Sequence, residues 1–266
     1  MVEKETSFLE PHPNLSPERR NQILAAVGLG ARRIFDQMPL LPVHDITHVE
    51  RVVKNTRAIC QGEGIDSFIP EVAAWLHDIG RLQEIQAQAD GKKIYHAEES
   101  AKQVPAILEP FKPELGEETI IAVQDAVARH SLPNAENDSQ LVKILKDADK
   151  LDGLGSIGFF RVFAFYPERP IYNPQNPFED GSTSEEYLRY SGQSSQVQAF
   201  LRNMEWFSDP RFWIVTPTAA RLAVPRVKLM VDFLYQLADE LGVPQGEVSK
   251  IPIVQASQKR LASLSS

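Results

Sequence analysis

The segment EVAAWLHDIG, residues 71–80, is apolar almost all the way round a helix, except that it carries His77 and Asp78 near its end. A helix that is apolar on every face is normally buried. An ionised carboxylate in such a setting is costly unless it is paired or bound to a metal. The apolar helix itself contains no Lys or Arg, and the carbonyl end of a helix favours positive charge. The segment therefore predicts a buried helix whose last turn contributes to a cation site.

Apolar residues recur at helical spacing along most of the chain. No alternating segments flanked by hairpin turns interrupt this pattern, so a sheet is not expected. One helix is expected within VHDITHVERVVKNTRAIC, with Thr47 as its N-cap. A long C-terminal helix is expected to kink at Pro225 and to stop at Gly242. The predicted fold is all-α, with further helices over residues 17–38, 70–79, 96–108, 117–130 and 139–152.

Residues 166–196 are dense in Pro, Asn, Ser and Gly and are longer than an ordinary connection. Such a loop either covers an active site or is simply mobile, and the sequence leaves both readings open. We expect a single helical domain with this one long excursion. Its expected bounds are 17–249, after an N-terminal arm of residues 1–16 and before a C-terminal tail of residues 250–266.

The charge balance limits the classes of partner. The 266 residues carry a formal net charge of −8 and no long basic run, which argues against a nucleic acid or an anionic membrane surface as the main partner. A small anionic substrate remains compatible, because a local cation can override the global sign. The one cysteine, Cys60, excludes an internal disulfide and a thiolate cluster. No apolar signal segment or membrane span is evident, which predicts a cytoplasmic protein.

Several histidines and aspartates fall on the apolar faces or near the ends of the predicted helices. Two or more imidazoles with carboxylates and no thiolate suit Mn, Fe, Co, Ni or Zn better than Ca or Mg. On the helical wheel of residues 139–152, Asp152 lies nearest the apolar stripe, with Asp147 and Asp149 on either side. Periodicity therefore does not decide which aspartate binds the metal. The candidates are His48, His77, Asp78, His130, Asp147, Asp149 and Asp152.

The order of His48, His77-Asp78 and a later Asp in DADK is similar to the H…HD…D signature of the HD-domain phosphohydrolases. HDITHVERV, AAWLHDIGR, ARHS and LKDADKLDGLGSIGFFRVF resemble the bacterial branch that contains nucleotide pyrophosphohydrolases. TAARLAVPRVKLMVDFL resembles the closing helix of that branch, so the likeness extends from about Pro42 to Leu241. The resemblance implies an all-helical enzyme that uses a divalent metal to hydrolyse phosphate esters or pyrophosphate bonds.

The resemblance also implies roles for individual residues. The family ligand in the last motif is the Asp directly before Lys or Arg, which here is Asp149. Histidines in the places of His96 and His130 are extra ligands in two-metal members and face the substrate phosphate in single-metal members. The implied metal ligands are His48, His77, Asp78 and Asp149, and the implied catalytic residues are Asp78, His130 and His96. Beside these ligands, Arg81 and Lys150 are candidate contacts for substrate phosphate oxygens. His44, Asp147 and Asp152 are expected to cap helices or support the ligands.

The expected function is therefore that of a metal-dependent phosphohydrolase, with Mn or Fe as the favoured metal and a nucleotide as the substrate class. One departure from the branch is the run AFLRNM, residues 199–204, where a His-Phe-x-x-Lys-Leu stretch is common. Two alternatives stay open. The first is a di-iron oxygenase on the same scaffold, for which His96 and His130 would be the extra ligands. The second is a non-catalytic metal- or nucleotide-binding regulator.

Overall fold

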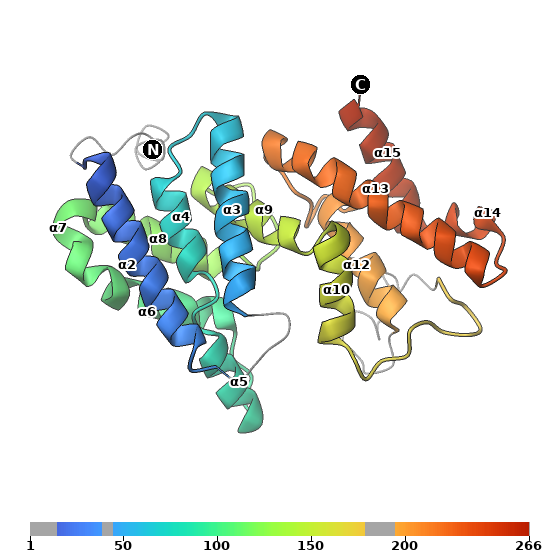
Figure 1. Cartoon of the computed structure of the whole chain (residues 1–266), viewed down its shortest axis with the longest axis horizontal. Coiled ribbons are helices and arrows are strands. Elements are labelled where there is room, and N and C mark those ends of the chain that lie inside the picture. Colours follow the sequence, from blue (N-terminus) through green and yellow to red (C-terminus); the bar gives the residue numbers. More distant parts are fainter. Residues whose placement is uncertain (1–14, 39–44, 179–194, 266) are drawn as a thin grey trace. The chain divides into compact units, whose positions relative to one another are not determined.

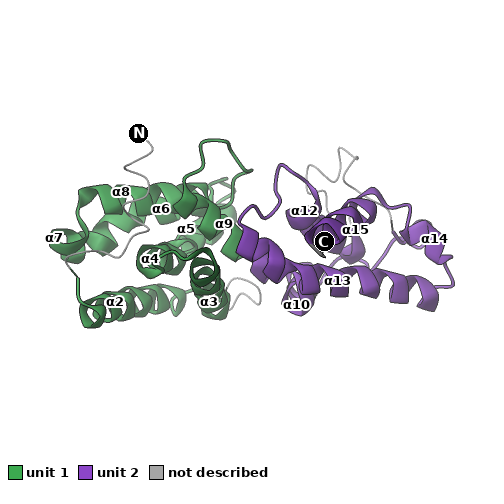
Figure 2. Ribbon diagram, turned by 90° about the horizontal axis from the view of Figure 1, so that it is seen from above, with its two compact units in different colours: residues 1–149 green, residues 150–266 purple. Residues whose placement is uncertain are grey.

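The computed structural model describes residues 15–38, 45–178 and 195–265. All regular secondary structure in these ranges is helical (Figure 1), which confirms the predicted all-α fold. The chain groups into two compact units, residues 1–149 and residues 150–266 (Figure 2). The domain bounds 17–249 stay a prediction.

Helix α4 (Phe68–Leu76) is the centre of the first unit, because all nine of its residues are buried. It packs against four other helices, which are α2 (Pro17–Phe35), α3 (Ile46–Glu63), α6 (His96–Leu108) and α8 (Glu117–Arg129). The expectation of a buried helix over residues 70–79 is thus confirmed, although the helix ends at Leu76 and His77 is its C-cap. His77 and Asp78 therefore lie just beyond the helix and not inside its last turn.

Two helix starts depend on side-chain caps. Helix α2 begins as expected after Ser16, whose hydroxyl accepts from the backbone N–H of Arg19 at 3.2 Å. Helix α3 begins two residues earlier than expected, because Asp45 is its N-cap and accepts from the backbone N–H of His48 at 3.1 Å. The prediction of Thr47 as the cap was wrong: its hydroxyl donates to Asp45 at 2.7 Å. A carboxylate accepts both hydrogen bonds at once, and the cap fixes the first turn that carries His48.

A helix that the apolar pattern did not predict, α5 (Arg81–Ala89), follows the turn at residues 77–80. Gly80 allows this turn to press directly against the start of α6. A Cβ atom at Gly80 would lie 2.4 Å from the backbone nitrogen of Ser100 and 2.5 Å from the carbonyl oxygen of His96. The backbone N–H of Gly80 also donates to the Ser100 hydroxyl at 2.8 Å. This close approach brings His96 next to the residues of the turn.

Helix α9 (Gln140–Asp152) buries the predicted apolar stripe, which is Leu141, Ile144, Leu145, Ala148 and Leu151. Asn55 of α3 donates to the carbonyl of Ala148 at 3.0 Å, which fixes α9 against α3 one residue before Asp149. From the middle of α9, buried Lys146 donates to Asp138 at 2.7 Å and to the carbonyl of Pro133 at 2.9 Å, both in the segment before the helix. The short helices η1 (Glu109–Phe111) and α7 (Lys112–Leu115) precede α8.

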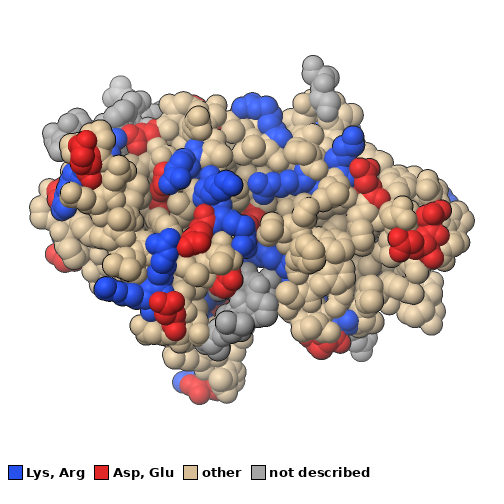
Figure 3. All heavy atoms as spheres, in the orientation of Figure 1, with Lys and Arg blue, Asp and Glu red and all other residues tan. Residues whose placement is uncertain are grey.

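Acidic and basic side chains are interspersed on the face of the molecule in Figure 3. Two ion pairs in the first unit connect neighbouring helices. Arg32 of α2 pairs with Glu50 of α3 at 2.9 Å, and Arg57 of α3 pairs with the buried Glu71 of α4 at 2.6 Å. The exposed pair adds little to stability, whereas the pair on Glu71 compensates a carboxylate that is removed from water.

The second unit contains five described helices, α10 (Gly155–Phe165), α12 (Gln196–Ser208), α13 (Pro217–Glu240), α14 (Gln245–Val248) and α15 (Pro252–Ser265). Helix α13 is the long helix that the sequence predicts. Pro225 lies inside it, and Gly242 follows its end with a φ of 67°, a conformation that glycine adopts without strain. Helix α10 packs on α13, and Phe159, Phe200 and Phe233 form an aromatic cluster among α10, α12 and α13.

Within residues 250–266, the expected C-terminal tail, the structure has the helix α15. Helix α15 packs on α12 and α13 and buries Ile253, Val254 and Ser257. Arg260 donates to the carbonyl oxygens of Phe207 and Ile214, both at 2.5 Å. Of the expected excursion, residues 166–178 are described and non-helical, and residues 179–194 lie outside the described ranges, as do residues 1–14 of the expected arm. None of the described helices is both long enough and apolar enough to cross a membrane.

Candidate metal centre

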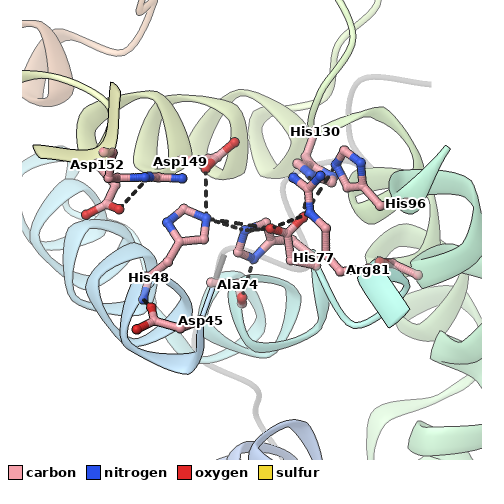
Figure 4. Close-up of polar contacts among 12 residues, drawn as sticks. Asp45, His48, Ala74, His77, Arg81, His96, His130, Asp149 and Asp152 are labelled. Carbon is pink, nitrogen blue, oxygen red and sulfur yellow. Dashed lines mark hydrogen bonds and ion pairs between the residues drawn. The ribbon is translucent and has the colours of Figure 1, made fainter. Parts of the chain in front are cut away.

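The centre lies in the first unit, where four helix ends and one helix side meet (Figure 4). His48 comes from the first turn of α3, and His77 and Asp78 come from the turn after α4. His96 begins α6, His130 caps the C-terminus of α8, and Asp149 lies on α9. The structure thus brings together the six residues to which the sequence assigns metal binding or catalysis.

His48, His77 and Asp78 form one group whose ligand atoms could hold a metal ion. The Nε2 atoms of His48 and His77 are 3.3 Å apart. Asp78 Oδ2 is 3.7 Å from Nε2 of His48 and 3.8 Å from Nε2 of His77. Asp149 Oδ1 approaches Nε2 of His48 to 3.3 Å from α9. Two tetrahedral ligands at about 2.1 Å from a cation are themselves roughly 3.4 Å apart, so this spacing fits shared ligation.

Asp78, His96 and His130 form a second group of the same kind. Asp78 Oδ1 is 3.4 Å from Nε2 of His96 and 3.6 Å from Nε2 of His130. The two groups therefore share Asp78, which turns one carboxylate oxygen toward each pair of histidines. Such a shared carboxylate is compatible with one cation and a substrate group, or with two cations.

Backbone carbonyls set the proton positions of two histidines. Nδ1 of His77 is 2.8 Å from the carbonyl oxygen of Ala74, and Nδ1 of His130 is 2.7 Å from that of Val127. A carbonyl oxygen only accepts hydrogen bonds, so each Nδ1 carries a proton. Burial lowers the pKa of His77 to about 4, which makes its ring neutral at pH 7 and leaves a lone pair on Nε2. Lone pairs and carboxylate oxygens that converge on one point are the arrangement that a cation requires.

Arg81 gives the buried carboxylate of Asp78 a partner that the sequence argument overlooked. Its Nε lies 3.1 Å from Asp78 Oδ2, and its Nη1 lies 3.0 Å from Glu84 Oε2. The burial of Asp78 alone is therefore no evidence for a metal. The evidence is the convergence of the histidine Nε2 atoms, which Arg81 does not explain. The guanidinium is held between two carboxylates, and its expected contact with substrate phosphate stays a proposal.

The charges in the centre favour ionised carboxylates. Burial by itself would raise the pKa of Asp78, but the charge of Arg81 and the neighbouring histidines hold it well below its usual value. Burial opposes ionisation of Asp149 too, and its hydrogen bond with His48 outweighs that effect and lowers the pKa. Both carboxylates are consequently negative at neutral pH, as metal ligands must be.

The exposed fractions of the side chains show on which side solvent reaches the centre. The side chains of His48, His77 and Asp78 are at most 1% exposed. Those of Asp149 and His96 are 29% and 13% exposed. Solvent therefore reaches the centre beside the last two residues.

The other candidate residues have different surroundings. Asp152 pairs with Arg161 at 2.6 Å, which identifies it as a support for α10. Asp147 is fully buried, so the face of α9 that holds it is covered, and its expected role in capping or in supporting the ligands stays a prediction. Lys150 is buried as well, and its role as a substrate contact stays a proposal. His44 lies outside the described residues.

Sequence reasoning missed Glu84, whose Oε1 is 3.2 Å from Nδ1 of His96. Glu84 lies on α5, in which none of the residues is buried. The helix has only two large apolar side chains, Leu82 and Ile85, and neither is buried, so the clearest signal in the sequence was the charge pattern Arg81–Glu84 at a spacing of three.

A comparison with models of protein families identifies the domain that contains this centre. Residues 45–154 match the model of the HD domain. This chain contains an HD domain. The match includes all six residues of the centre and ends two residues after α9. No protein with a curated description matches the chain.

Solved structures extend the likeness beyond the HD domain. A predicted HD superfamily hydrolase from an uncultured Thermotogales bacterium is 26% identical, with a TM-score of 0.51 over 83% of this chain and 91% of that chain. A protein from Listeria innocua is 26% identical, with a TM-score of 0.60 over 85% and 98% of the two chains. YpgQ from Bacillus subtilis is 22% identical, with a TM-score of 0.55 over 83% and 96%, and shares the fold. The chain has the fold of the HD superfamily hydrolases and a His/Asp cluster that could hold a metal.

Proposed function

We propose that this protein is a metal-dependent phosphohydrolase that acts on a small phosphorylated substrate. The observation that carries the proposal is the convergence of Nε2 of His48, Nε2 of His77 and Oδ2 of Asp78 on one point. These residues and Asp149 would hold a divalent transition metal, and Mn or Fe are the favoured ions for imidazole and carboxylate ligands.

When bound, such a cation would polarise a phosphoryl oxygen and acidify a water molecule. Asp78 is ionised and buried, so its carboxylate can orient that water and accept its proton. His130 and His96 face the other oxygen of Asp78. From there the imidazolium form of either ring, with a proton on Nε2 as well as on Nδ1, could donate a hydrogen bond to a phosphate oxygen and stabilise the negative charge that develops during hydrolysis. We therefore assign catalytic roles to Asp78, His130 and His96.

A nucleotide is the substrate class that we propose. The support is the likeness of HDITHVERV, AAWLHDIGR and LKDADKLDGLGSIGFFRVF to the branch with nucleotide pyrophosphohydrolases. The structure of YpgQ was determined in complex with ADP, which makes ADP a reasonable first probe. Arg81 and Lys150 are the basic residues that we propose for the substrate phosphates. A cytoplasmic location also stays a prediction.

The second group, Asp78 with His96 and His130, favours an alternative. If it holds a second iron, the centre could activate dioxygen instead of water. Dioxygen consumption by the iron-loaded protein, with loss of activity under anaerobic conditions, would identify such an oxygenase. A non-catalytic regulator would bind metal or nucleotide without turnover.

The experiment that tests the proposal is a screen of nucleoside mono-, di- and triphosphates with Mn²⁺, in which inorganic phosphate and pyrophosphate are measured. We expect metal-dependent release from at least one nucleotide and a loss of at least about 100-fold in His77→Ala, because the cation is lost. Release that persists in His77→Ala, or metal-loaded protein that hydrolyses no phosphorylated compound, would refute the phosphohydrolase.

A further inference from the structure

Nδ1 of His96 lies 3.2 Å from Oε1 of Glu84, in hydrogen-bond contact. Nε2 of the same ring is 3.4 Å from Asp78 Oδ1, but within the described residues it has no hydrogen-bond partner. The ring of His96 thus stands between two carboxylates, and only the contact with Glu84 has the geometry of a hydrogen bond. In the neutral ring one nitrogen carries the proton and the other carries a lone pair.

The second oxygen of Glu84 is also occupied. Oε2 accepts from Nη1 of Arg81 at 3.0 Å, and Nε of Arg81 in turn lies 3.1 Å from Asp78 Oδ2. Asp78, Arg81, Glu84 and His96 therefore form a closed ring in which carboxylates alternate with a guanidinium and an imidazole. Both oxygens of Glu84 act as acceptors: Oε2 accepts from Arg81, and Oε1 accepts from the backbone N–H of His96 at 3.4 Å as well as from Nδ1 of its ring.

We propose that Glu84 is a positioning residue of the metal centre, because its carboxylate holds the proton of His96 on Nδ1 and so presents the lone pair of Nε2 to the cation site shared with Asp78 and His130. The consequence for metal binding rests on the proposed function. Histidine ligands commonly donate their second ring N–H to a carboxylate, which fixes the orientation and the tautomer of the ring. His77 and His130 achieve the same with backbone carbonyls, whereas His96, at the start of a helix, has a carboxylate instead.

Glu84→Gln is the sharpest variant because it keeps the size of the side chain and makes one of its two acceptors a donor. The guanidinium contact is charged and is closer than the contact with His96, so the remaining oxygen should stay with Arg81. The new NH₂ group then faces Nδ1 of His96, and an NH₂ group can only donate. The proton of the ring should therefore move to Nε2, which then cannot bind a cation.

The tautomer can be read in the metal-free, full-length protein by ¹H–¹⁵N correlation NMR of the histidine rings at pH 8, where an ordinary imidazole is neutral. The chain has six histidines, and the signals that disappear in His96→Gln identify His96. In the wild type we expect the proton on Nδ1. In Glu84→Gln we expect it mainly on Nε2. The control Glu98→Gln removes the same charge from an exposed position on α6 and should leave the wild-type pattern unchanged.

Titration with Mn²⁺ alone, followed by calorimetry, tests the consequence. We expect Glu84→Gln to weaken binding of the cation that contacts His96 by about 10- to 100-fold, the usual effect of losing such a supporting partner. Glu98→Gln should stay within about twofold of the wild type. A proton on Nε2 in the wild type, an unchanged tautomer in Glu84→Gln, or a moved proton with wild-type affinity would each overturn the inference. Metal retention in His77→Ala would instead overturn the proposed function, so the two failures are distinguishable.

Discussion

The Nε2 atoms of His48 and His77 face each other at 3.3 Å, although the two residues are 29 positions apart, one in the first turn of α3 and the other in the turn after α4. The ring of His77 is neutral and protonated on Nδ1. Its Nε2 therefore accepts, and the only proton that could lie between the rings is that of His48. Asp149 Oδ1 competes for the same proton from 3.3 Å. A cation in place of this proton would satisfy all three groups at once, which is the physical basis for the proposed centre.

Asp149→Asn should lower the affinity for Mn²⁺ by tenfold or more, because it keeps the shape of the side chain but removes the charge that faces His48. Asp147→Asn should keep the affinity. Asp147 is fully buried, so its loss of charge should instead reduce the free energy of unfolding by roughly 1–3 kcal/mol. Metal titration and denaturant unfolding of both variants measure the two effects. Metal loss in Asp147→Asn with retention in Asp149→Asn would show that the ligand is misassigned.

Gly80→Ala should destabilise the protein by roughly 1–3 kcal/mol or more, since the added methyl group would meet the backbone of Ser100 and His96 at 2.4–2.5 Å. Backbone atoms cannot yield as a flexible side chain can, so α6 must shift and carry His96 away from Asp78. Gly30→Ala is the matched control. A Cβ at Gly30, inside α2, meets no atom within 4 Å, and alanine there should stabilise the helix by up to about 1 kcal/mol. Equal effects of the two changes in thermal unfolding would disprove the close approach.

Cys60 should react very slowly with maleimide in the native protein at pH 8. Burial raises the pKa of the Cys60 thiol to about 12, so only about one molecule in ten thousand carries the reactive thiolate at that pH. Denaturation should restore rapid labelling. The raised pKa also predicts an effect of pH on the free energy of unfolding. Above about pH 9 the unfolded state loses the thiol proton more readily than the native state does. The free energy of unfolding therefore declines as the pH rises toward 12. Labelling as fast in the native protein as in urea would show that the thiol is accessible.

The apolar pattern predicted those helices whose stability depends on burial. Helices α4, α8 and α9 have several buried residues at helical spacing, and their positions agree with the prediction to within a few residues. Helix α5 has no buried residue, and the buried face of α15 includes a serine, Ser257, beside Ile253 and Val254, so the apolar pattern of both segments is weak. In α10, by contrast, apolar residues occur on almost every face of the helix, so they do not mark the buried side, which contains only Gly155, Gly158 and Val162. Periodicity cannot identify such segments.

The sequence was sufficient to predict the candidate metal ligands. The HD pair and the order of the remaining motifs indicated His48, His77 and Asp149, and the fold brings them together with Asp78. The supporting residues were not predictable in the same way. Arg81 and Glu84 support the centre through contacts of about 3 Å, which depend on the backbone turn at Gly80. The spacing of residue types along the sequence does not reveal the geometry of that turn. The missed cap at Asp45 has a similar cause, since Thr47 is itself a good N-cap residue.

The central claim is that His48, His77, Asp78 and Asp149 hold a divalent cation, and the most direct test is the metal content of protein purified without chelator, measured by mass spectrometry. We expect at least one equivalent of a transition metal per wild-type chain and in Glu98→Gln. His77→Ala and Asp78→Ala should retain less than about a tenth of that amount while keeping the helical circular dichroism of the wild type, because each removes a ligand from the convergent group. Wild-type metal content in folded His77→Ala would contradict the account.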